Sequence, residues 1–158
     1  MRVFLALALP CLLSAQSAAS PPTASPAPAA PVAESRHSHD AVMKAVDDLM
    51  WQLKLGDIAE VDKIVYTSTP PHYVPNRTAP GALDPMIVYA YTFIPKNLDR
   101  AKKHPLLVYV HGGVHSDFKT GSSSNSAHIV REMIGQGYVV VAPDYRGSTG
   151  YGRNYYDD

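Results

Sequence analysis

Hydrophobic residues recur at helical spacing between Ala41 and Leu55. They fall on one stripe of a helix, while most charged residues of the segment lie off it. The stripe consists of Val42, Val46, Leu49 and Leu53. Met50 and Trp51 widen the apolar face, and Gly56 stands where a helix commonly ends. We therefore expect a helix over 41–55 that docks onto a larger body through this face.

Further along the chain the pattern changes to the alternation that is typical of strands. Val61–Tyr66 and Met86–Ile94 alternate and are enriched in β-branched and aromatic residues, so they predict two strands. Leu106–Val110 is a short continuous apolar run, as expected for a strand buried on both faces. The connection over 69–85 is rich in proline and contains Asn76, a glycosylation acceptor by pattern.

A helix and one more strand complete the pattern. The helix is predicted from about Ser126 to Gln136, closed by Gly137, and Tyr138–Ala142 predicts an apolar strand stopped by Pro143. The order strand, strand, strand, helix, strand ends in a βαβ unit. We predict an α/β fold with a mainly parallel sheet and flanking helices.

The start of the chain differs in composition from the rest. Residues 1–19 combine Arg2, an apolar run too short to span a bilayer and several small residues, which predicts a cleaved signal peptide. Residues 20–37 are mostly Pro, Ala, Ser and Thr and predict a disordered linker, and 38–158 predict the folded domain. The single cysteine, Cys11, lies in the leader, so we expect a secreted or periplasmic mature chain without thiol chemistry.

Charge and histidine placement narrow the function classes. The 14 Lys and Arg balance the 14 Asp and Glu, which argues against a nucleic acid partner and against stable membrane association after signal cleavage. Two histidines, His37 and His39, flank Ser38 but lack further partners at ligand spacing. We favour helix capping by Ser38 or Asp40 over a metal site, and we expect no metal and no organic cofactor.

Two glycine-containing loops follow apolar strands, at the edge where open α/β sheets place their active sites. In the first loop, His111 precedes Gly112 and Gly113, whose backbone N–H groups can stabilise an oxyanion. A plain strand-ending turn is the alternative. The second loop runs over 143–152, and its glycine spacing fits a phosphate loop. An Arg-Asn pair stands where Lys and Ser or Thr belong, which argues against nucleotide binding.

Together these loops resemble the prolyl oligopeptidase family of serine peptidases. The family's third strand and oxyanion loop are similar to HPLLVYVHGGVHS, and its next strand and loop are similar to GYVVVAPDYRGSTGYGRNYYDD. The resemblance covers roughly the last third of the chain. Esterases of the hormone-sensitive lipase type have related loops, but Val114 and Gly147 depart from their usual pattern. Many members of the peptidase branch have proline at the position of Val114.

The resemblance implies an α/β-hydrolase domain in which a serine attacks an acyl carbon, a histidine acts as base and an aspartate orients it. It implies that the Gly113 N–H, aided by Gly112, donates to the oxyanion of a peptide or acyl substrate. The resemblance also implies that four further residues belong to the active-site loops, namely His111, Tyr145, Arg146 and Gly147.

The catalytic triad is missing from the 158 residues, since no G-x-S-x-G motif occurs and Ser148 lies in another kind of loop. In this fold the serine, aspartate and histidine all follow the loop at which the sequence stops. We therefore expect 38–158 to be an incomplete hydrolase domain, inactive alone, of an exported serine peptidase. A secreted carboxylesterase and a non-catalytic binding domain are the alternatives, and the oligomeric state stays open. Leu106–Val110 would be an unpaired apolar edge, which predicts poor solubility.

Overall fold

The computed structural model describes residues 32–121 and 125–158, with side chains from Arg36 onward. Its elements are, in chain order, α1 (Val32–Leu55), β1 (Ala59–Thr67), β2 (Ile87–Pro95), β3 (Leu106–Val108), α2 (Ser126–Gly135), β4 (Val139–Asp144) and α3 (Arg153–Tyr156). The predicted helices and strands are all present, with ends that differ by a few residues except at the start of α1, and α3 is additional. The predicted signal peptide and most of the predicted linker lie outside the described residues.

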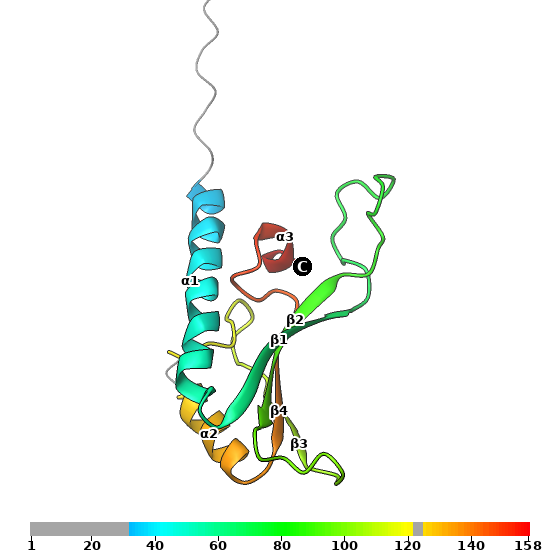
Figure 1. Cartoon of the computed structure of the whole chain (residues 1–158). Coiled ribbons are helices and arrows are strands. Elements are labelled where there is room, and N and C mark those ends of the chain that lie inside the picture. The colour runs from blue at the N-terminus through cyan, green and yellow to red at the C-terminus, as the bar shows by residue number, and fades with distance from the viewer. Residues whose placement is uncertain (1–31, 122–124) are drawn as a thin grey trace, which may run out of the picture.

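The four strands form one mixed sheet in the order β1-β2-β4-β3 (Figure 1). β1 pairs with β2, and β2 with β4, in antiparallel fashion. β3 and β4 are parallel and enclose α2, which confirms the βαβ unit. The prediction of a mainly parallel sheet is wrong for the described residues, because β1 and β2 form an antiparallel pair that adds to β4 on the side away from β3.

β4 runs through Pro143, so the prediction that this proline stops the strand is wrong. Pro143 pairs with Ala90 of β2, whereas the ladder to β3 ends where Val108 meets Val141. Beyond that point β4 has no strand on its second side, and a residue without an N–H is tolerated there. The preceding strand is also shorter than predicted, since β3 ends at Val108.

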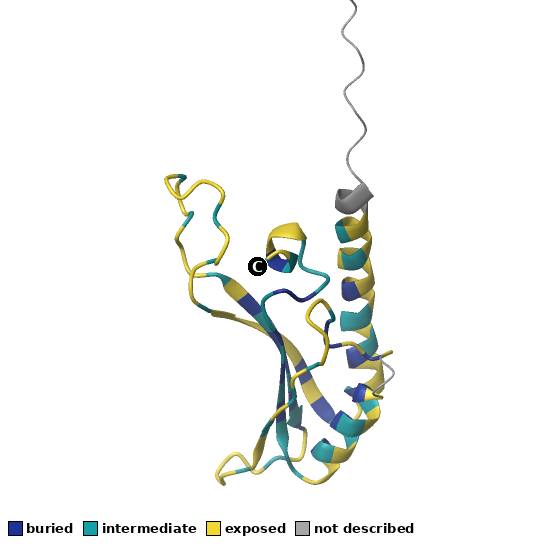
Figure 2. Cartoon of the chain, turned by 180° about the vertical axis from the view of Figure 1, so that it is seen from behind, coloured by how far each residue is buried: buried dark blue, intermediate teal, exposed yellow. Residues whose placement is uncertain are grey.

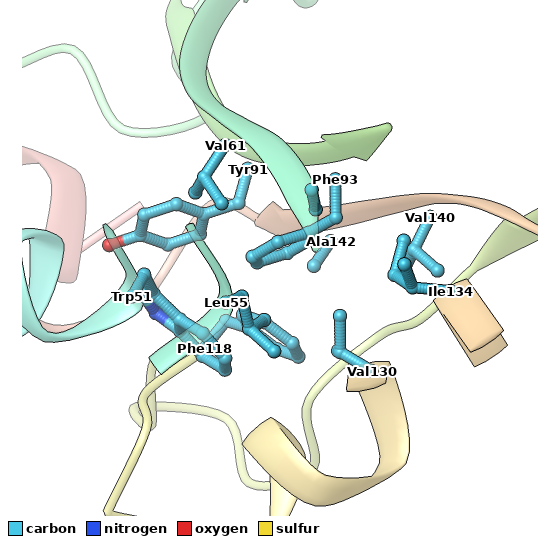
Figure 3. Close-up of a cluster of buried hydrophobic side chains, with 11 residues drawn as sticks. Trp51, Leu55, Val61, Tyr91, Phe93, Phe118, Val130, Ile134, Val140 and Ala142 are labelled. Carbon is cyan, nitrogen blue, oxygen red and sulfur yellow. The ribbon is translucent and has the colours of Figure 1, made fainter. Parts of the chain in front are cut away.

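The core lies between one face of the sheet and the helices α1 and α2 (Figure 3). Trp51 of α1 stacks on Phe118 with ring centroids 4.9 Å apart and meets the edge of Phe93 at 5.1 Å. The core consists of Trp51, Leu55, Ala59, Val61, Tyr91, Phe93, Phe118, Val130, Ile134, Val140 and Ala142. Burial of these side chains holds both helices to the sheet, since buried apolar area contributes about 25 cal/mol per Å².

Of the face of α1 that was predicted to dock, Trp51 is buried, but the stripe itself is not (Figure 2). The stripe predicted to dock is exposed: Val42 62%, Val46 48%, Leu49 71% and Leu53 77%. The buried residues of α1 are Lys44, Trp51 and Leu55. The face that carries Trp51 and Lys44 packs on the protein. Trp51 supplies the largest apolar side chain, and Lys44 pairs with the buried carboxylates of Asp117 and Asp144.

α1 also begins earlier than predicted. Its first residue is Val32, so the last residues of the segment assigned to the linker, 32–37, are helical. Ser38 and Asp40 therefore lie inside the helix, and the prediction that one of them caps its N-terminus is wrong. Asp40 instead faces Arg36 one turn earlier, with an N–O distance of 3.9 Å.

Candidate functional site

The two loops that follow β3 and β4 lie against each other at one edge of the sheet. The two strands are parallel, so their C-terminal ends share this edge. The Tyr145 hydroxyl donates to the carbonyl oxygens of His111, at 3.2 Å, and Gly113, at 3.0 Å. Nδ1 of His115 donates to the Gly147 carbonyl at 2.9 Å. Five residues from two segments far apart in sequence thus form one hydrogen-bonded unit.

Ring stacking reinforces the junction between the loops. The His111 ring stacks on Tyr145 with centroids 4.3 Å apart, and the His115 ring stacks on Tyr156 of α3 at 3.9 Å. Gly147 has φ 88, and a Cβ there would lie 3.4 Å from the Val114 carbonyl oxygen. A side chain at this position would both strain the backbone and crowd the contact between the loops.

Gly112 and Gly113 present their backbone N–H groups at the surface of this unit. Both residues are exposed, and Gly113 has a positive φ of 84. Within the described residues neither N–H group has an internal acceptor. Exposed N–H donors on a loop that follows a strand are candidates for binding an oxyanion.

His111 points away from that surface and into the protein. Its Nε2 lies 3.0 Å from Oγ of Ser148 and 3.6 Å from Oδ1 of Asp144. The pair superficially suggests a serine–histidine dyad. Ser148 is fully buried, however, and its hydroxyl donates to the Tyr145 carbonyl at 2.5 Å. His111 therefore donates to Ser148 and takes no proton from it, so the contact positions the two loops.

Asp144 is the buried anchor beneath both loops. Oδ1 accepts from the Phe118 N–H at 2.5 Å, and Oδ2 accepts from the Tyr151 hydroxyl at 2.5 Å. The Tyr155 hydroxyl donates to the main-chain carbonyl of Asp144. Nζ of Lys44 lies 2.7 Å from Oδ2 and forms the ion pair.

Lys44 connects α1 to these loops. Besides Asp144, its Nζ contacts the Phe118 carbonyl at 2.6 Å and Oδ2 of Asp117 at 3.3 Å. Its side chain is only 3% exposed. Sequence analysis missed this role, because it counted Lys44 only among the charged residues that lie off the apolar stripe. The signal that was available is the spacing of Lys44, Trp51 and Leu55, which puts the lysine on the same face as the tryptophan.

Carboxylates and burial shift the pKa values of two tyrosines near this anchor. Burial, and then the charge of Asp144, raise the pKa of Tyr151 far above its ordinary value. Burial and the hydrogen bond to Asp48 raise the pKa of Tyr91 in the same direction. Both phenols therefore stay neutral donors to carboxylates across the physiological range.

Arg146 points away from the junction of the two loops and contacts the 69–86 connection between β1 and β2. Its guanidinium pairs with Asp158, and it donates to Oγ1 of Thr69 at 2.6 Å. Asp158 in turn accepts from the His72 N–H at 2.6 Å. A pocket of about 620 Å³ adjoins this cluster and is lined by Pro71, Tyr73, Val74, Pro75, Gly81, Ala82, Met86, Arg153, Asn154, Asp157 and Asp158.

The predicted site residues thus divide into two groups. The first group, Gly112, Gly113, His111, Tyr145 and Gly147, lies together at the junction of the loops. Arg146 leaves the same loop in another direction, toward Thr69 and Asp158. In the part of the chain that the structure describes, no group of three His, Cys, Asp or Glu side chains is arranged to hold a metal ion.

The structure contains an α/β unit with paired loops at the ends of two parallel strands, and comparison with known proteins shows which proteins the chain is similar to. No protein-family model matches the chain. Dipeptidyl-peptidase 5 of Aspergillus fumigatus is 39% identical over 66 residues, which are 42% of this chain and 9% of that protein. Probable dipeptidyl-peptidase 5 of Aspergillus terreus is 40% identical over 70 residues, 44% of this chain and 9% of that protein. These relatives confirm the resemblance to the prolyl oligopeptidase family of serine peptidases.

A solved structure also matches the chain. Acylaminoacyl peptidase of Pyrococcus horikoshii aligns with a TM-score of 0.43 and 19% identity, over 63% of this chain and 13% of that one. The chain spans about a tenth of the length of the curated relatives that it matches.

Proposed function

We propose that this chain supplies the oxyanion loop of an exported serine peptidase of the prolyl oligopeptidase type, which cleaves peptide or acyl bonds. In this proposal 38–158 are the front part of an α/β-hydrolase domain. The nucleophilic serine, the aspartate and the histidine come from sequence that follows Asp158 in the full-length protein. The chain alone is then inactive.

The observation that carries the proposal is the pair of N–H donors at Gly112 and Gly113. They lie on the loop that follows β3, which the Tyr145 hydroxyl holds through the Gly113 carbonyl. Such donors act on the negative charge that develops in the transition state, and removal of one costs about 10²–10³ in kcat in a serine peptidase. A rigid loop matters here because a donor displaced by about 1 Å loses most of its effect.

The test uses the complete polypeptide that the gene encodes. It is treated with a fluorophosphonate probe, which labels activated serines, and is assayed on dipeptidyl p-nitroanilides and p-nitrophenyl esters. The proposal predicts labelling together with release of p-nitroaniline. Cleavage of the esters without the anilides selects a carboxylesterase instead. A protein that ends at Asp158 and takes up no probe selects the non-catalytic binding domain.

A further inference from the structure

The exposed apolar stripe of α1 has the spacing of a coiled-coil seam. Val42, Val46, Leu49 and Leu53 are separated by four, three and four residues, the alternation of d and a positions in a heptad repeat. We call these four residues the α1 seam. All four are about half exposed or more, from 48% to 77%. A continuous row of exposed Val and Leu on a helix is unusual on a finished surface.

The α1 seam points away from the body of the protein. With the seam at a and d, the buried residues Lys44 and Trp51 fall at f and Leu55 falls at c. These positions lie on the opposite side of the helix. The seam is therefore neither part of the core nor a continuation of it, and a partner placed on it meets only α1.

The positions that flank the seam carry no charge. The e and g positions between residues 42 and 53 are occupied by Met43, Ala45, Met50 and Gln52. The charged residues of the same stretch, and Lys54 beyond it, fall at b, c and f. Like charges at e and g are the usual obstacle to pairing of identical helices, and the stretch between residues 42 and 53 has none.

We propose that the α1 seam pairs with the same seam of a second copy of this chain. The spacing of four, three and four is the same in both directions. A second copy in antiparallel orientation therefore sets Val46 against Leu49 and Val42 against Leu53. Since each body lies on the far side of its own helix, the two bodies do not compete for the same space.

A lipid surface fits the seam less well than a second copy does. Residues 41–55 contain two lysines and two aspartates, so the helix has no basic face for anionic headgroups. Its other side is already packed on the sheet. Among the helices within 32–121 and 125–158, none is long and apolar enough to cross a membrane.

The test measures the mass of the complete encoded protein by analytical ultracentrifugation between about 1 and 100 μM, the range of a small and weak interface. The wild-type chain is expected to shift from one to two monomer masses. Leu49→Glu is expected to raise the dissociation constant at least tenfold, because it buries a carboxylate in the seam. Lys54→Gln makes the same change in net charge away from the seam and is expected to leave the dimer intact.

Two further variants separate this seam from other routes of association. Val108→Lys, on the edge strand β3, is expected to leave dimerisation unchanged. In a Cys11→Ala background, the pair Val46→Cys/Leu49→Cys is expected to form intermolecular disulfides in either helix orientation, whereas Lys54→Cys is not. A wild-type chain that stays monomeric at 100 μM overturns the proposal. Association that Leu49→Glu leaves unchanged, or seam-dependent binding to phosphatidylglycerol vesicles without dimers, overturns it equally.

Discussion

At the scale of single residues, Lys44 is the strongest link between α1 and the loops of the candidate site. Its Nζ contacts Asp144, Asp117 and the Phe118 carbonyl in an almost fully buried position. Lys44→Met leaves the buried Asp144 carboxylate without its cation, while Asp117 keeps its pairing with Lys119. We expect it to lower the free energy of unfolding by about 3–5 kcal/mol, measured by urea denaturation.

The control for this prediction is Lys102→Met. Lys102 pairs with Asp99 at 3.1 Å, but both side chains are largely exposed, at 75% and 49%. An exposed pair contributes about 0–1 kcal/mol. Equal effects of the two substitutions would show that Lys44 acts as an ordinary surface charge and not as an anchor of the loops.

The tyrosines that donate to buried carboxylates make the fold sensitive to alkali. Burial raises the pKa of Tyr91 and Tyr151 above the unfolded value of about 10. Their contribution to stability is therefore complete below about pH 10 and is lost as the pH rises above it. Monitored by phenolate absorbance and circular dichroism, the two phenols are expected to ionise only as the chain unfolds. The Tyr151→Phe variant should lose less stability between pH 9 and about pH 11.

Single residues also show where inference from the sequence stops. Gly112 and Gly113 were singled out from the sequence because glycines after an apolar strand have a local physical meaning, whereas Tyr145 was named through the family resemblance. The roles of Lys44 and Ser148 depend on partners far along the chain, such as Asp144. No local pattern tells a buried lysine from a solvated one until the opposing carboxylates are placed.

At the scale of elements, α1 shows how a correct helix can be assigned the wrong face. The period of the apolar stripe gave the helix, but it could not tell which partner the stripe meets. The sheet takes Trp51 and Leu55, while Leu49 and Leu53 stay exposed. An apolar stripe on a helix identifies a contact surface, and here the core uses the other side.

Two substitutions on α1 test this assignment directly. Trp51→Ala removes a fully buried ring from the core, and we expect a loss of about 3–5 kcal/mol in the free energy of unfolding. Leu53→Ala, at a side chain that is 77% exposed, is expected to change it by less than about 0.5 kcal/mol in the monomer. Urea denaturation at low protein concentration makes the comparison, and the reverse ranking would restore the stripe as the docked face.

At the scale of the whole molecule, the order of elements and the βαβ unit could be predicted, but the sheet could not. Parallel pairing of β3 and β4 follows from the helix between them. The antiparallel attachment of β2 to β4 joins segments that are about 50 residues apart, and no turn between them fixes their direction. The order of elements therefore could not predict the direction in which β2, and with it β1, joins β4.

The sheet of the described residues ends in an apolar edge. β3 pairs only with β4, and its Leu106 and Val108 are 61% and 56% exposed. An exposed apolar edge promotes aggregation, so Val108→Lys is expected to increase the soluble yield of the chain. Turbidity at matched concentrations measures this, with Lys103→Arg as a neutral control. No gain in soluble yield would contradict an aggregation route through β3.

The central claim is that Gly113 supplies an oxyanion donor. The most direct measurement compares Gly113→Ala with Gly112→Ala in the complete encoded protein, by steady-state kinetics on a dipeptidyl p-nitroanilide. Gly113 has φ 84 and a Cβ there would lie 3.3 Å from Cβ of Ser116, whereas a Cβ at Gly112 meets no atom within 4 Å. Alanine keeps the backbone N–H, so the expected effect comes from the strain and crowding at Gly113, which displace that donor. The account predicts that Gly113→Ala lowers kcat about 10²–10³-fold with KM little changed, and that Gly112→Ala stays within about threefold of wild type. A Gly113→Ala enzyme with the kcat of the wild type would contradict it.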